Sequence, residues 1–437
     1  MLRRQFGQMV VAVPAAGLLA AQHASAAQAS GTVANSASAL ATLTNNLTTL
    51  APGWQVATPS GDTSGATDTQ FLNATLTAAG PGTSLWLAPG KWYVNGPITP
   101  LAGQRISGLH GASQSGDGAS GDEGTVLMAV GTSWPAANGQ FGVFAYPTAL
   151  NQGEITDLWI DCTKFTGSNL CGVAAVGSAN AISLRNVGVY QAPSDGFLLA
   201  ADASNNVPDG WYLDTCLAQT CGGNGFSGKF NDASLINCHA QTCGGDGFVI
   251  TSANAKLTGC RGDLCTNGFT IDVTDGGGFN DATVLTGCGT QRNNQDGLNI
   301  INSSSAGSSY RSPVVVDGCT FGGDGYNDGD GTASNIYYAG IRVRGANTVI
   351  IGSASVTVHT YSRNGFPQTS CPKFGLTVGE MGTGSTYPHL VTVATAMLNG
   401  ASAAVHDGSN GATIVSFGAG VYGATGYQPT TFTKPTP

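Results

Sequence analysis

Three stretches of this sequence repeat one another: Leu213-Asp214-Thr215-Cys216, Leu235-Ile236-Asn237-Cys238 and Leu257-Thr258-Gly259-Cys260. Their cysteines lie 22 residues apart, and each stretch continues to a second cysteine and then to a Gly-Phe pair. Related units precede and follow, from residue 184 to residue 319. One such unit cannot bury its own apolar side, whereas stacked units share a continuous core. The repeat therefore predicts a solenoid with about 22 residues in each turn.

The composition agrees with short strands and tight bends. Only 9% of the 437 residues are charged, against roughly 25% in ordinary soluble proteins. The 65 glycines are about twice the usual share of roughly 7%. Five residues that share one register tolerate a positive φ angle, which suits a sharp bend in every turn. They are Asn186, Asn237, Gly259, Gly287 and Gly318.

The region before the repeats predicts a short helix, Asp68 to Leu76, that ends at Gly80-Pro81-Gly82. Two strands around Pro89-Gly90 follow, within residues 85–94. This pattern resembles the N-terminal cap of the pectate-lyase-like superfamily, which includes glycosidase-like and phage tailspike β-helices. The resemblance covers residues 60–110 by motif and 150–380 by repeats. It implies an all-β, right-handed, single-stranded parallel β-helix with an N-terminal capping helix, and a polysaccharide as partner.

The predicted organisation is a signal peptide (1–26), a lead-in segment (27–59), the β-helix domain (60–425) and an extended tail (426–437). Arg3-Arg4, the apolar stretch Met9–Ala21 and Ala24-Ser25-Ala26 are typical of export, so we expect a secreted or periplasmic protein, with the twin-arginine route as one option. The apolar stretch is too short to span a bilayer. The net charge of −9 argues against nucleic acid as a partner.

The 11 cysteines fall mostly in the repeat registers. Neighbouring turns of such a fold lie about 4.8 Å apart, so we expect the thiols to face inward in buried ladders. A disulfide is the alternative for an exported chain. Zinc is disfavoured because four residues separate the members of each pair, instead of the usual two.

A candidate catalytic group follows from the same register. His239 and Arg261 come directly after equivalent cysteines, and Asp214 and Asp263 lie close to them in sequence. Histidine can act as acid or base near neutral pH, two carboxylates could serve a hydrolase, and Arg261 could neutralise a uronate. The alternative is a solvated face with scattered polar residues.

Four residues are candidates for substrate binding, although large aromatic side chains more often pack in cores. They are Trp211, Tyr212, Tyr190 and Arg185; Trp159 is a further aromatic of this kind.

Acidic residues elsewhere suggest two other roles. Asp324, Asp328 and Asp330 lie in a glycine-rich stretch that we expect to project as a loop, where their oxygens could bind Ca²⁺ or simply face water. Asp and Asn exchange in one register before a glycine, which predicts hydrogen bonding in turns rather than catalysis. That register holds Asp195, Asn224, Asp246, Asn267 and Asp296.

Two functions remain open. The first is a polysaccharide-active enzyme, with a slight preference for a glycoside hydrolase over a polysaccharide lyase. The second is a non-catalytic glycan-binding or adhesion protein, which the lack of known catalytic signatures favours. The sugar, the linkage and the oligomeric state do not follow from the sequence.

Overall fold

The computed structural model of this protein describes residues 54–109, 124–134, 141–146, 149–251, 254–273, 282–301, 313–325, 338–344, 348–361, 369–379, 390–407 and 414–422. The chain divides into two units, Met1–Val56 and Ala57–Pro437. The fold below is that of the second unit; strand β1 (Trp54–Ala57) lies at the division. The predicted signal peptide and tail lie outside the described residues, so they stay predictions.

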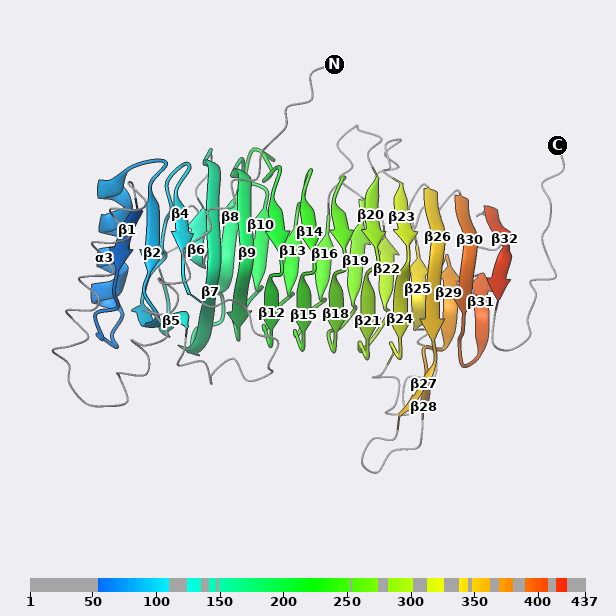
Figure 1. The fold of residues 1–437 in the computed structure, drawn as a ribbon. Coiled ribbons are helices and arrows are strands. Elements are labelled where there is room, and N and C mark those ends of the chain that lie inside the picture. Colours follow the sequence, from blue (N-terminus) through cyan, green and yellow to red (C-terminus); the bar gives the residue numbers. More distant parts are fainter. Residues whose placement is uncertain are drawn as a thin grey trace, which may run out of the picture. The chain divides into compact units, whose positions relative to one another are not determined.

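The second unit is a parallel β-helix, as the sequence predicts, in which each turn adds one strand to each of three ladders (Figure 1). The first ladder holds β2 (Ser84–Leu87), β4 (Arg105–Ser107), β11 (Tyr212–Asp214), β14 (Ser234–Ile236), β17 (Lys256–Thr258), β20 (Thr283–Thr286) and β23 (Val314–Asp317). The second holds β3 (Gly90–Val94), β5 (Thr125–Gly131), β12 (Leu217–Gln219), β15 (His239–Gln241), β18 (Arg261–Asp263), β21 (Gly289–Gln291) and β24 (Cys319–Gly322).

Five long strands run through both of these ladders: β7 (Asn151–Phe165), β9 (Asn180–Tyr190), β26 (Thr348–Thr357), β30 (Leu390–Leu398) and β32 (Ile414–Tyr422). The third ladder is a separate sheet of β6 (Gly142–Tyr146), β8 (Cys171–Val176), β10 (Phe197–Ala200), β13 (Phe226–Gly228), β16 (Phe248–Ile250), β19 (Phe269–Asp272), β22 (Leu298–Ile301), β25 (Ala339–Val343), β29 (Phe374–Val378) and β31 (Ala403–Asp407). A small antiparallel pair, β27 (His359–Tyr361) and β28 (Thr369–Cys371), stands apart.

The bend between the first and second ladders is a single residue with positive φ. Asn186 (φ 55°), Asn237 (φ 51°) and Gly259 (φ 65°) occupy it in different turns, which confirms the predicted register. A hydrogen bond joins the bends to the next turn: the Asn237 backbone N–H, for example, donates to the Thr258 carbonyl at 2.8 Å.

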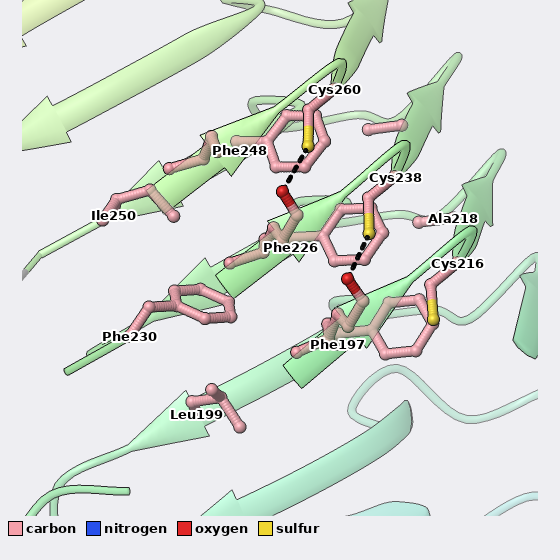
Figure 2. Packing of buried hydrophobic residues seen from close by; sticks show 14 of the residues in the cluster. Phe197, Leu199, Cys216, Ala218, Phe226, Phe230, Cys238, Phe248, Ile250 and Cys260 are labelled. Carbon is pink, nitrogen blue, oxygen red and sulfur yellow. Dashed lines mark hydrogen bonds between the residues drawn. The ribbon is translucent and has the colours of Figure 1, made fainter. Parts of the chain in front are cut away.

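Two columns of the core repeat the same residue turn upon turn, one of phenylalanine and one of cysteine (Figure 2). Phe197, Phe226, Phe248 and Phe269 stack with ring centroids 4.6 to 4.8 Å apart and with nearly parallel planes. Offset stacking of aromatic rings at this spacing adds to the free energy gained by burial. The phenylalanine column therefore stabilises the stacking of successive strands in the third ladder.

The cysteines of the repeats form the expected buried ladders, and ten of the 11 cysteines are buried free thiols. The Cys238 thiol donates to the Leu213 carbonyl of the preceding turn at 3.6 Å, and the Cys260 thiol does the same to Leu235 at 3.3 Å. Burial raises the pKa of the Cys171 thiol to about 11, and buried thiols of this kind pack as small apolar groups.

Helix α3 (Ala66–Ala79) lies between β1 and β2 in the chain, and Leu72 and Leu76 reach the main core. The helix starts at Gly65 and ends at Gly80, whose backbone N–H donates to the Leu76 carbonyl. Its role as a cap on the β-helix stays a prediction. In the part of the chain that the structure describes, no helix is both long enough and apolar enough to cross a membrane.

Candidate functional site

Residues of the second ladder alternate between the core and the outer face. Ala240 lies in the core, so His239 and Gln241 face outward on β15; Gly262 places Arg261 and Asp263 outward on β18 in the same way. The register pairs His239 with Arg261 and Gln241 with Asp263. The outer face thus carries two parallel columns of side chains. Successive side chains in a column lie one rung apart, which is about 4.8 Å.

His239, Arg261 and Asp263 form one hydrogen-bonded group on this face. The Asp263 Oδ2 atom lies 3.0 Å from His239 Nε2 and 2.8 Å from a terminal nitrogen of Arg261. A carboxylate oxygen accepts hydrogen bonds, so His239 donates to Asp263 through Nε2. The side chain of Asp263 is 8% exposed, whereas that of Arg261 is 54% exposed.

Three polar atoms on this face are buried and have no hydrogen-bond partner among the described residues: Gln219 Oε1, His239 Nδ1 and Asp263 Oδ1. They come from three successive rungs, β12, β15 and β18. Buried polar atoms nearly always have partners, because an unmade hydrogen bond costs free energy. Their gathering on one outer face makes this face the candidate binding surface.

An apolar group continues the same face toward β5. Val126, Met128, Trp159 and Leu217 form a second cluster outside the main core, with Tyr93 and Tyr190 packed against it. The ring of Trp159 lies over Gly188, where an added Cβ would come within 2.3 Å of the indole. The face therefore changes from aromatic to polar along the axis of the β-helix.

Asp214 does not join the group. It lies on β11 of the first ladder, where its register partners are Arg185 and Ile236, and the positive-φ residue Thr215 separates it from the second ladder. Its carboxylate accepts from the neighbouring Thr215 hydroxyl at 2.9 Å.

The predicted binding residues are also divided between ladders. Tyr190 lies in the same column as Gln219 and Asp263, but Arg185 and Tyr212 are on the first ladder. Arg185 donates to Glu154 at 2.8 Å. Trp211 is 1% exposed, and its indole N–H donates to the Ala179 carbonyl. The packing of Trp211 leaves no ring face for a sugar.

Asp324 is not in a projecting loop. It is fully buried, and its carboxylate accepts from the Thr290 hydroxyl at 2.6 Å and from the Asn293 side chain at 2.9 Å. Asp328 and Asp330 lie outside the described residues, so the calcium site stays a prediction. Groups of three or more potential metal ligands are absent from the described residues.

The Asp/Asn register forms a ladder of turn hydrogen bonds, as predicted. Each side chain accepts from the backbone N–H of the next turn: Asn224 donates to Asp195 at 2.6 Å, Asp246 to Asn224 at 2.8 Å and Asn267 to Asp246 at 3.0 Å. These residues therefore hold the turns together.

The sequence reasoning missed Gln219, Gln241 and Asp161 on the outer face. The signal was present, since Gln219 and Gln241 are 22 residues apart and each lies two residues before the second cysteine of its turn. Asp161 follows Trp159 by two residues and shares the column of Tyr190.

No family model matches this sequence, and no curated protein is similar to it. Among solved structures, the catalytic domain of a GH87 α-1,3-glucanase in complex with nigerose has a TM-score of 0.51 and 14% identity, over 84% of this chain and 67% of that chain. The catalytic domain of a GH87 α-1,3-glucanase in complex with tetrasaccharides has a TM-score of 0.50 and 15% identity, with the same coverage.

The A-module of the Azotobacter vinelandii mannuronan C-5 epimerase AlgE4 is 12% identical, with a TM-score of 0.43 over 83% of this chain and 93% of that chain. Identities this low show a shared fold alone. The chain is a parallel β-helix protein, and its all-parallel ladders share this fold with the two glucanase domains.

Proposed function

We propose that this protein is an extracellular polysaccharide-active enzyme that binds an extended glycan across the outer face of the second ladder. The observation that carries the proposal is the group of His239, Arg261 and Asp263, set beside unpartnered buried polar atoms and beside the aromatic Tyr190. The β-helix fold supports the proposal, and the neighbours of similar fold include α-1,3-glucanases solved with sugars bound.

The spacing of carboxylates on this face favours proton abstraction over hydrolysis by a carboxylate pair. Asp161 and Asp263 share a column but are four rungs apart, which is about 19 Å at 4.8 Å per rung. Glycosidases need their two carboxyl groups about 5 to 9.5 Å apart. We therefore move from the hydrolase that the sequence slightly favours to a lyase-type reaction at this site.

In this reaction Asp263 orients the imidazole of His239, which takes the proton next to the carboxylate of a uronate residue. Arg261, half-exposed beside them, neutralises that carboxylate and so favours loss of the proton. The elimination then forms a double bond between the two ring carbons and breaks the bond to the leaving sugar oxygen, which takes up a proton from water, and an unsaturated uronate remains. A chain of net charge −9 repels an acidic polymer overall, and a local arginine offsets this repulsion at the site.

A panel of acidic and neutral polysaccharides tests this proposal with two readouts, absorbance of unsaturated uronates and release of reducing ends. We expect absorbance with an acidic polymer, and a loss of about 10²–10⁴-fold in rate for His239→Gln. The matched control is Asp214→Asn on the first ladder, which should keep wild-type activity. Reducing ends without absorbance would indicate a hydrolase, and no product from any polymer would indicate a binding protein.

A further inference from the structure

The outer face of the second ladder continues beyond Arg261 and Asp263 as a strip of small and polar residues. The strand register places four of them in the next two rungs, β21 and β24: Gly289, Gln291, Thr320 and Gly322. Gln291 and Thr320 are exposed, and the two glycines put no side chain on the face. This polar strip is therefore open to a ligand in solution.

A second histidine lies over the polar strip. His359 is the first residue of β27, which follows β26 and begins the small antiparallel pair (Figure 1). A Cβ added to Gly322 would lie 3.5 Å from His359 Nε2 and 3.0 Å from the Thr357 hydroxyl oxygen. The same Nε2 atom lies 3.3 Å from Thr357 Oγ1, and His359 is exposed. The imidazole thus occupies space that a side chain at position 322 would fill.

Gly322 interrupts a column of longer side chains. Four residues precede it in successive rungs: Gln219, Gln241, Asp263 and Gln291. Gly322 is not among the residues with a positive φ angle, so its backbone conformation does not require a glycine. What the missing side chain provides is room for His359 above the strip.

We propose that His359 binds a further sugar residue of the glycan whose uronate lies against Arg261, an inference that rests on the function proposed above. His359 lies over the rung two steps beyond Asp263, which is about 10 Å away at 4.8 Å per rung. A group that transfers a proton must lie within hydrogen-bond reach of the reacting atom. His359 is therefore a binding residue, and its ring nitrogens form hydrogen bonds with sugar oxygens.

The two directions along the face differ in what they offer a sugar. Toward β5 lies the apolar cluster, in which Met128, Trp159 and Leu217 are each no more than 6% exposed. Toward β26 lie exposed donors and acceptors on Gln291, Thr320 and His359. Because a few placed polar groups fix the orientation of a bound ligand, the glycan extends from the reacting uronate along the polar strip.

The test is calorimetric titration of the full chain with oligogalacturonates and oligomannuronates, each as the disaccharide and the hexasaccharide. We expect His359→Ala to weaken binding of a hexasaccharide about three- to tenfold, the worth of one lost hydrogen bond. Gly322→Val should do the same because it displaces the imidazole. Binding of the disaccharide, which is too short to reach His359 from Arg261, should not change in either variant.

The matched control is His406→Ala, which removes a histidine from the separate sheet of the third ladder and should bind both lengths as the wild type does. Wild-type affinity for the hexasaccharides in His359→Ala would overturn the inference, and so would equal affinity of the wild type for both lengths. Neither result bears on the reaction, which is judged by the unsaturated product and its loss in His239→Gln. Absence of that product, with the length-dependent loss of binding intact, would reject the reaction alone.

Discussion

A buried amide and a buried carboxyl group continue the column of second cysteines where the cysteines end. Asn293 and Asp324 each follow a positive-φ residue, as Cys265 does, so they occupy the register of the second cysteine. The Asn293 side chain donates to both the Gly262 carbonyl and Asp324. A small polar network thus replaces the thiols at this end of the column.

Burial raises the pKa of Asp324 from the usual 3.8 to about 7. The native state therefore holds this proton more tightly than the unfolded chain does. Its contribution to the free energy of unfolding is complete below about pH 4 and is lost as the pH rises through 7. The protein should accordingly become less stable between mildly acidic and mildly alkaline solution.

We expect Asp324→Asn to reduce the fall in melting temperature between pH 5 and pH 8, because an amide does not ionise there. Thermal unfolding of wild type and variant across this range measures the difference. Parallel pH profiles for the two proteins would show that the carboxyl of Asp324 is not protonated in the native state.

The sequence predicted part of the site because register alone placed His239 beside Arg261. It failed for Asp214, because the one-residue bend at Thr215 moves a side chain to another ladder without any gap in the sequence. It failed for the setting of Asp324, because the surrounding glycines resemble a loop and the interior position appears only once the bend at Gly323 is located.

At the scale of elements, the phenylalanine column is the strongest fixed point of the third ladder. Phe248 is fully buried and stacks on Phe226 and Phe269 at 4.8 Å on both sides. We expect Phe248→Ala to lower the free energy of unfolding by about 3–5 kcal/mol, since it opens a cavity and removes two stacking contacts.

Denaturant unfolding measures this change, and Phe71→Ala is the matched control. Phe71 lies on α3 with 44% of its surface exposed, so its removal should change the stability by no more than about 0.5 kcal/mol. Equal effects for the two variants would contradict the stacked column.

The strands and the bend between the first and second ladders could be predicted because most of their residues favour these backbone conformations. The bend that follows the second ladder could not be predicted. Its residues Thr220, Thr242 and Leu264 adopt φ between 56° and 58°, although their side chains disfavour a positive φ angle. The stacking of turns supplies the compensation: Thr220 N–H donates to the Gln241 carbonyl at 2.9 Å and Thr242 N–H to the Asp263 carbonyl at 3.0 Å. Bonds between turns are invisible in a single repeat.

For the whole molecule, the solenoid predicts tolerance to loss of one complete turn. Each turn contacts chiefly its neighbours, so stability is close to a sum over turns and their interfaces. Deleting residues 217–238 joins Cys216 to His239 and retains the register, because Leu217 pairs with His239 and Gln219 with Gln241. We expect the shortened protein to fold, with its β-sheet circular dichroism intact and a melting temperature within a few degrees of wild type.

Deleting residues 217–227 is the matched control, since half a turn brings strands of different ladders into register. That protein should fail to fold. If both deletions were equally harmful, the turns would not be interchangeable units of structure.

The most direct measurement is a crystal structure of the protein with an acidic oligosaccharide bound. The account predicts that the sugar chain crosses β12, β15 and β18, with one uronate carboxylate against Arg261 and the adjacent ring carbon facing His239. An oligosaccharide bound on the first ladder beside Asp214, with the second-ladder face empty, would contradict it.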